Sequence, residues 1–215
     1  MSKSNKYGYV GVDIPEQSFG SNKGIFDPAE INELVADNKW TQYGQLELIE
    51  TQTVSDVTTV NFTSLQGSEY NVHFLTYSNV SVETGNNGIG MRFRESGTYE
   101  TASVYKWSQV RVEGSTFSDQ KNTGYSRIPL IWYALGTNTG GNGNGYVYFY
   151  NLHNSAKYSF ITQQSSGWGY ASNNGMLFGN GVLPQASTVD GIQFSNYDGN
   201  TNINGTFSLY GIRYS

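Results

Sequence analysis

Hydrophobic and polar residues alternate along most of the chain, with a period of two that starts near residue 45. Such alternation is typical of β-strands that bury one face in a core. The segment IGMRFRE shows it best, because Ile89, Met91 and Phe93 would point inward while the residues between them point outward. Strand-like runs lie at residues 45–53, 57–62, 70–77, 89–95, 99–110, 128–135, 146–152, 158–162, 189–194 and 205–214.

Gly and Asn are concentrated in the segments between these runs, such as ETGNNG, TNTGGNGNG, SSGWGYASNNG and YDGNTNING. Asn-Gly pairs accept positive φ angles, so these segments predict hairpins and loop tips. No long stretch with a helical period follows residue 45. We therefore predict an all-β domain over residues 45–215, with about nine or ten strands in an antiparallel, jelly-roll-like β-sandwich.

Residues 1–44 lack this alternation and are predicted to form an irregular arm with one short helix. In the segment FDPAEINELVADN, Asp27 is a good N-cap, Pro28 suits the first helical position and Glu30 completes a capping box. A helix over residues 28–37 would carry an apolar stripe of Ile31, Leu34 and Val35. This stripe would either pack on one end of the sandwich or anchor the chain to a neighbouring subunit.

The composition narrows the possible partners. Charged residues make up 13% of the chain and the net charge is -5, and Lys and Arg form no run, so we expect no nucleic-acid binding. There is no cysteine, which excludes disulfides and thiol chemistry. The start, MSKSNKYGYVGVDIP, has no apolar run of signal-peptide length. We therefore expect synthesis in a cytoplasm and no insertion into a membrane.

Residues that could carry catalysis or hold a metal are few. His73 and His153 lie on different runs without a second histidine at ligand spacing, and His73 is interpreted as a half-buried strand residue. Neither a GxSxG motif nor a phosphate-binding GxxxxGK[ST] motif occurs. The acidic loop at residues 198–200 is interpreted as a turn, and whether it binds Ca²⁺ stays open. We predict no catalytic residues, no metal and no cofactor, and hence that the protein is not an enzyme.

Paired carboxylates, as glycosidases use, are also not predicted. Glu47 and Glu50 have odd spacing, so they point to opposite faces of a regular strand unless a bulge intervenes. Glu95 and Glu100 flank a predicted turn at Gly97, where solvated hairpin charges are the simpler interpretation.

Several strands instead carry apolar residues on both faces. In RIPLIWYAL and GYVYFYN, both sets of alternating positions are apolar or aromatic. A strand of this kind is usually covered on both sides, by the arm, by a loop or by another subunit. The residues predicted to form an oligomer interface are Trp132, Tyr133, Tyr146, Tyr148 and Tyr150.

Two further aromatic residues, Trp168 and Tyr170, lie among small polar residues in SSGWGYASNNG. A flat ring in such a loop would stack on a sugar or anchor a protein partner. Alternatively, it would fold back onto the sandwich.

Longer segments resemble a known group of proteins: YGQLELIETQTVS, VNFTSL, YNVHFLTYSNV, YVYFYNLHNSAKYSFIT, GNGVLPQASTVDGIQF and the ending GTFSLYGIRYS. Over about residues 43–215 the chain resembles structural proteins of tailed bacteriophages, particularly aquatic phages. The blocks LPQASTVDGI and GTFSLYGI carry this resemblance most strongly.

The resemblance implies a jelly-roll module in a capsid-associated, tail or fibre protein of the virion. We predict an oligomeric capsid decoration or outer appendage component, expected to be a homotrimer, that contacts itself and other virion proteins. The alternative is a tail-fibre or receptor-binding knob that acts in host adsorption by recognising a host surface glycan.

Overall fold

The computed structural model describes residues 28–36, 46–83, 87–135, 142–168, 174–197, 199 and 201–212, apart from the side chains of Pro28 and residues 132–134. The chain divides into two compact units, residues 1–43 with 215, and residues 44–214. In the first unit the described element is helix α1 (Pro28–Ala36), predicted as 28–37. All the strands belong to the second unit, and the predicted all-β fold is confirmed.

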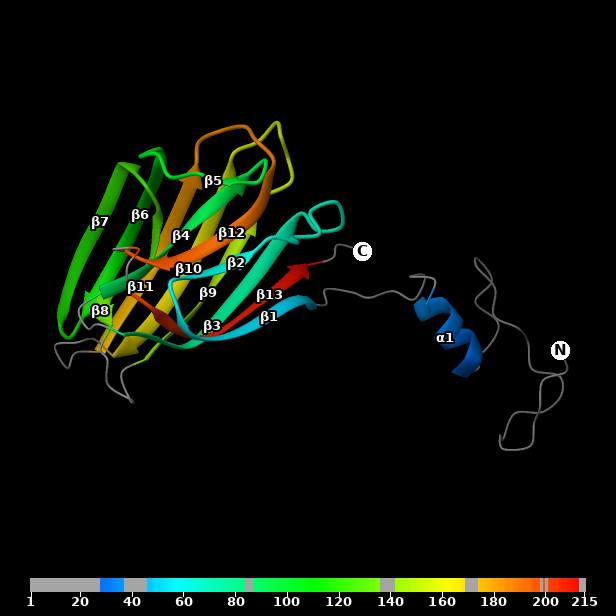
Figure 1. The fold of residues 1–215 in the computed structure, drawn as a ribbon, viewed down its shortest axis with the longest axis horizontal. Helices are drawn as coiled ribbons and strands as arrows, with labels where there is room; N and C mark the ends of the chain where they lie inside the picture. The colour runs from blue at the N-terminus through cyan, green and yellow to red at the C-terminus, as the bar shows by residue number, and fades with distance from the viewer. Residues whose placement is uncertain are drawn as a thin grey trace, which may run out of the picture. The chain divides into compact units, whose positions relative to one another are not determined.

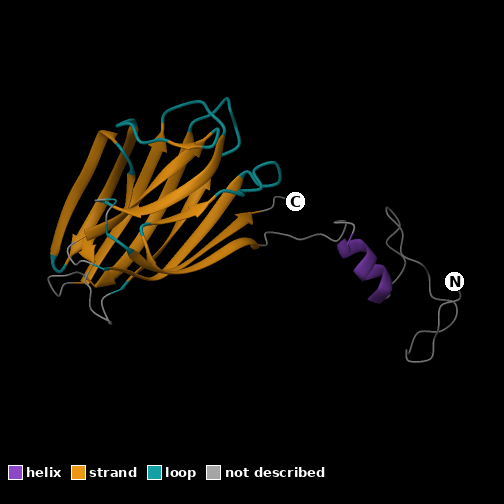
Figure 2. Ribbon diagram, in the orientation of Figure 1, coloured by secondary structure: helices purple, strands orange, loops and turns teal. Residues whose placement is uncertain are grey.

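The second unit is a sandwich of two antiparallel sheets (Figures 1 and 2). The large sheet contains, in spatial order, β1 (Leu46–Val57), β13 (Ile203–Ile212), β3 (Val72–Val82), β9 (Gly143–Tyr150), β10 (Ser159–Trp168), β11 (Asn174–Leu183), β6 (Tyr105–Glu113) and β7 (Thr116–Tyr125). The small sheet contains β2 (Thr59–Phe62), β12 (Val189–Asn196), β4 (Asn87–Glu95) and β5 (Thr98–Tyr99), and β8 (Ile128–Leu135) also pairs with β4.

The chain passes repeatedly from one sheet to the other. β1, β3 and β13 belong to the large sheet, whereas β2, β4 and β12 belong to the small one. β9, β10 and β11 form a simple meander in the large sheet. Frequent exchange between two antiparallel sheets is typical of jelly-roll-like sandwiches, as predicted.

The core lies between the sheets and is filled by the inward residues of the predicted alternation. Ile89, Met91 and Phe93 of β4 are buried in one cluster with residues of the large sheet such as Phe207 and Leu209. Each such side chain stabilises the fold by about 1.5–3 kcal/mol through burial. The outward arginines of the same segment are only half-buried, as predicted.

Strand β8 packs on a glycine-rich part of the large sheet. A Cβ on Gly181 would lie 2.6 Å from Ile128, and a Cβ on Gly143 would lie 2.6 Å from Ile131. The carbonyl of Pro129 accepts two buried hydrogen bonds of 2.7 Å, from the side-chain amides of Gln109 and Gln163 of the large sheet. The buried apolar residues of this strand, Ile128, Leu130, Ile131 and Leu135, are therefore covered by the chain itself.

Two strands were not predicted from the sequence pattern. β7 is polar on both faces, and β11 carries glycines at its inward positions, so neither shows an apolar period. With these two, and with the predicted run 99–110 divided into β5 and β6, the described residues contain thirteen strands rather than nine or ten. Of the predicted interface residues, the side chains of Trp132 and Tyr133 lie outside the described part.

Candidate functional site

The outer face of the large sheet carries rows of uncharged residues, many of them apolar or aromatic, that run across its strands. Antiparallel pairing aligns one outward residue from each of six neighbouring strands. The first row is Leu46, Ile212, Val72, Tyr150, Phe160 and Val182. The second is Leu48, Tyr210, Phe74, Tyr148, Thr162 and Asn180, and the third is Thr51, Ser208, Thr76, Tyr146, Gln164 and Phe178. We call these three rows the aromatic face.

At the centre of the aromatic face is a cluster of four rings. The ring centroid of Phe74 lies 4.7 Å from that of Tyr148, 5.9 Å from that of Tyr146 and 6.2 Å from that of Tyr210. Such tilted arrangements at 4.5–7 Å are favourable, so the cluster holds its rings in fixed positions. The hydroxyl of Tyr146 also donates a hydrogen bond of 3.0 Å to Oε1 of Gln164. The cluster is therefore an ordered surface rather than a set of loose side chains.

The aromatic face is uncharged and open. None of the residues in its three rows is acidic or basic. The exposed fraction is 60% for Leu48, 43% for Phe160 and 44% for Phe178. Depletion of charge with enrichment in aromatic residues is the signature of the core of a protein–protein interface.

The outer face of the small sheet is built differently. Nε of Arg94 lies 2.8 Å from Oδ1 of Asp190, and Nε2 of Gln193 donates to Oδ1 of Asn61 at 2.9 Å. Nε of Arg92 donates to the carbonyl of Ser126 at 2.9 Å. These polar side chains are thus paired within the chain.

The predicted interface tyrosines, Tyr146, Tyr148 and Tyr150, do lie side by side on the aromatic face. Trp168 is 45% exposed and ends β10, at the opposite end of the β9–β10 pair from Tyr150. Its predicted companion, Tyr170, lies outside the described residues. Phe74 was missed as a member of the surface, because only the strand order brings it beside Tyr148 and Tyr210.

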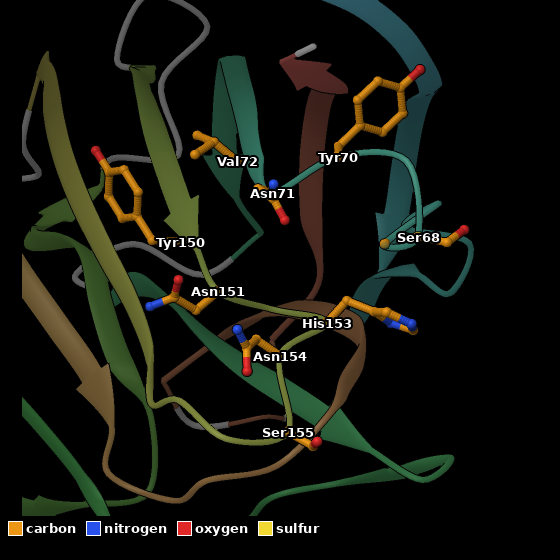
Figure 3. Close-up of a pocket in the computed structure, with 10 residues that line it drawn as sticks. Ser68, Tyr70, Asn71, Val72, Tyr150, Asn151, His153, Asn154 and Ser155 are labelled. Carbon is orange, nitrogen blue, oxygen red and sulfur yellow. The ribbon is translucent and has the colours of Figure 1, made fainter. Parts of the chain in front are cut away.

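A pocket of about 660 Å³ opens at one end of the sandwich (Figure 3). It is formed by the β2–β3 connection and the start of β3 on one side, and by the end of β9 and the β9–β10 connection on the other. The residues that line it are Gly67, Ser68, Tyr70, Asn71, Val72, Tyr150, Asn151, His153, Asn154 and Ser155.

Both walls of this pocket are anchored in the core. Leu65 and Leu152, one from each connection, are buried. Nε2 of His73 lies 2.6 Å from the carbonyl of Leu65, and the amide of Val189 donates to the carbonyl of Leu152 at 2.6 Å. Burial lowers the pKa of His73, so its ring is neutral near pH 7 and Nε2–H donates to Leu65. His73 is thus fully buried rather than half-buried, and it supports the wall.

The carboxylates of Glu47 and Glu50 point to the same side of β1, which corrects the prediction of opposite faces. The register shifts between Leu48 and Glu50, and this bulge supplies the extra residue that turns Glu50 inward. Oε2 of Glu47 accepts a hydrogen bond of 2.6 Å from the hydroxyl of Tyr70, and Oε1 of Glu50 accepts one of 2.8 Å from Gln52. Both carboxylates therefore have structural partners.

The other candidate acids also have structural roles or lie outside the described residues. The predicted turn between Glu95 and Glu100 is present, with positive φ at Ser96 and Gly97. Oε1 of Glu100 accepts a hydrogen bond of 2.7 Å from the amide of Ala102. Asp198 and Asn200 are not described. In the described part of the chain, no group of three or more His, Cys, Asp or Glu could hold a metal ion.

Comparisons with known proteins found no match: neither a protein-family model, nor a curated protein, nor a solved structure matches the chain.

On helix α1, Ile31 and Leu34 are half-buried and Val35 is 45% exposed. In the portion of the chain that the structure describes, no helix has the length and apolar character needed to cross a membrane.

Proposed function

We propose that this protein is a non-enzymatic structural component of a bacteriophage virion, which assembles as a homo-oligomer through its aromatic face. The observation that carries the proposal is an uncharged, aromatic surface that extends over six strands of one sheet. Its outward residues include tyrosines, a type enriched at interfaces, whereas Lys, Glu and Asp, which interfaces avoid, are absent from its rows.

The partner on this face is a second copy of the chain. With a net charge of -5, two copies repel one another wherever their charged surfaces approach. The aromatic face lets them meet without bringing like charges together. A ladder of flat rings and short polar side chains also offers both apolar area and hydrogen bonds to an identical surface.

The place in a virion rests on the sequence resemblance to phage structural proteins. Within the particle, the sandwich serves as a capsid decoration or outer appendage and contacts other virion proteins. Val35 of α1, with 45% of its surface exposed, provides an apolar contact for attachment to a neighbouring subunit. A trimer is the expected oligomer.

Light scattering coupled to size-exclusion chromatography tests the assembly, and mass spectrometry of purified particles tests the location. We expect a mass of three chains in solution and this chain among the particle's proteins. A strictly monomeric protein that is missing from purified virions would end the proposal.

The second candidate is a receptor-binding knob of a tail fibre that recognises a host surface glycan. Trp168 favours it, because a tryptophan with 45% of its surface exposed is a suitable platform for a sugar ring. Glycan-array binding should then be lost in the variant with both Trp168→Ala and Tyr170→Ala. Binding that survives both substitutions rules out this site.

A further inference from the structure

The pocket at the end of the sandwich is built from two connections that meet only in the folded chain. Residues 67–72 and 150–155 are far apart in sequence, but β3 and β9 are neighbours, with Val72 paired to Tyr150. Figure 3 shows the side chains of Asn71, Asn151 and Asn154 gathered around a common space. The volume of about 660 Å³ lies within the range of about 300–1,000 Å³ that is typical of small-molecule sites.

The β9–β10 wall of the pocket is held in place by its own hydrogen bonds. The amide of Asn154 donates to the carbonyl of Asn151 at 3.1 Å, and the amide of Ala156 donates to Oδ1 of Asn154 at 3.0 Å. Nδ2 of Asn151 donates to the carbonyl of Tyr158 at 3.2 Å. A wall fixed in this way loses little conformational entropy when a ligand binds.

The chemistry of the lining is polar but uncharged. No Lys, Arg, Asp or Glu lines the pocket, and its polar side chains are three Asn, two Ser, one His and two Tyr. An amide group offers both donors and an acceptor, as does each hydroxyl group of a sugar. Phosphate and carboxylate ligands instead call for Arg or Lys.

One side of the pocket also offers an aromatic ring and an apolar surface. The ring of Tyr150 is half-buried, and its hydroxyl lies 3.2 Å from Oγ1 of Thr162. Val72 lies beside it in the sheet register. A fixed aromatic ring beside amide groups matches a sugar ring, which has an apolar C–H face and hydroxyl groups at its edge.

We propose that this pocket binds a neutral saccharide, which stacks on Tyr150 and hydrogen-bonds to the amides of Asn71 and Asn154. The site is separate from Trp168, and it shares Val72 and Tyr150 with the first row of the aromatic face. Because its contacts are few and exposed, single sites bind weakly, and several copies on one particle would strengthen attachment.

Saturation-transfer NMR with neutral and with acidic oligosaccharides tests this site on the full chain, at a protein concentration low enough that a second copy does not cover Tyr150. We expect signals from neutral hexose oligosaccharides that persist in Trp168→Ala. In Ser155→Trp, which fills the pocket, the signal should vanish. In Asn154→Asp, which keeps the acceptor for Ala156 but loses the amide donor, affinity should fall about tenfold.

The matched control is Ser103→Trp, which places the same large ring on an exposed serine outside the pocket and should leave binding unchanged. Circular dichroism of each variant shows whether it is folded. The proposal is overturned if the wild-type chain binds no neutral oligosaccharide, if only acidic ones bind, or if folded Ser155→Trp binds as well as wild type. These results leave the assembly proposal unaffected, because that is measured by mass.

Discussion

The two outer faces of the sandwich differ in whether their outward side chains have partners within the chain. On the small sheet, Arg94 pairs with Asp190 and Gln193 with Asn61, so its polar groups are satisfied within the chain. On the large sheet, uncharged rings such as Phe160 are left partly exposed. The polar groups of the small-sheet surface are paired in the isolated chain. The exposed rings of the large-sheet surface would be buried by a partner that covers them.

The difference singles out the large sheet's outer face as the surface that is open to a partner. Both sheets share one core, so burial alone does not distinguish their outer faces. What distinguishes them is whether the outward groups already have partners. A change made on one face, with a matched change on the other as the control, sharpens this comparison.

The largest effect is expected from a charge placed on the aromatic face. Phe160→Glu would bury a carboxylate between subunits, and should weaken association by about 2–4 kcal/mol, roughly 30- to 700-fold. Sedimentation over a range of concentrations measures this. Gln193→Glu is the matched control, because it adds a carboxylate beside Arg92 on the small sheet and should leave association unchanged. Equal weakening by both variants would contradict the comparison.

The opposite experiment removes a charge from the small sheet. Asp190→Ala deletes the ion pair with Arg94 and the hydrogen bond of 2.9 Å from the amide of Gly97. The unfolding free energy should fall by about 1–2 kcal/mol in urea, because both contacts are partly exposed, while the oligomer keeps its mass. Asp119→Ala, on exposed β7, is the control and should change stability by less than about 0.5 kcal/mol.

Lower pH should affect folding but not association. Burial lowers the pKa of His73 in the folded chain, whereas in the unfolded chain its pKa is near the ordinary value of 6.5. The contribution of His73 to stability is therefore complete above pH 6.5 and is lost as the pH falls toward its folded pKa. Urea unfolding at a series of pH values measures this.

His73→Gln should flatten that dependence. The aromatic face has no carboxylate or histidine, so the oligomer should keep its mass over the same pH range as long as the chain is folded. A mass that falls while the fold is intact would mean that titratable groups hold the copies together.

The smallest effect is expected from salt. Raising NaCl from about 0.05 M to about 0.5 M screens the Arg94–Asp190 pair and should cost a few tenths of a kcal/mol of stability. Association through the uncharged face should hold or strengthen, because the net charge of -5 is screened as well. Dissociation at high salt would indicate an interface held by ion pairs.

The alternation of residues was enough to predict which side of most strands forms the core. Ile89, Met91 and Phe93 are buried as predicted, because a strand fixes its side-chain period. β11 was missed because glycines such as Gly181 replace apolar residues where β8 approaches closely. The bulge that turns Glu50 inward likewise leaves no mark in the sequence.

The candidate surfaces were predictable only in part. Tyr146, Tyr148 and Tyr150 follow one another on one strand, so their common face was visible from spacing alone. The row that joins Phe74 to Tyr148 requires the order of the strands, and the pocket requires two distant connections to meet. Such features depend on tertiary pairing, which local patterns do not encode.

The most direct test of the account is oxidative footprinting of the wild-type chain at low and high concentration. The large-sheet residues Tyr148 and Phe160 should lose reactivity as the concentration rises, because another copy covers them. Tyr99, on the small sheet, should react equally at both concentrations. Unchanged reactivity of Tyr148 and Phe160 across the range would contradict the claim that the aromatic face is where the copies meet.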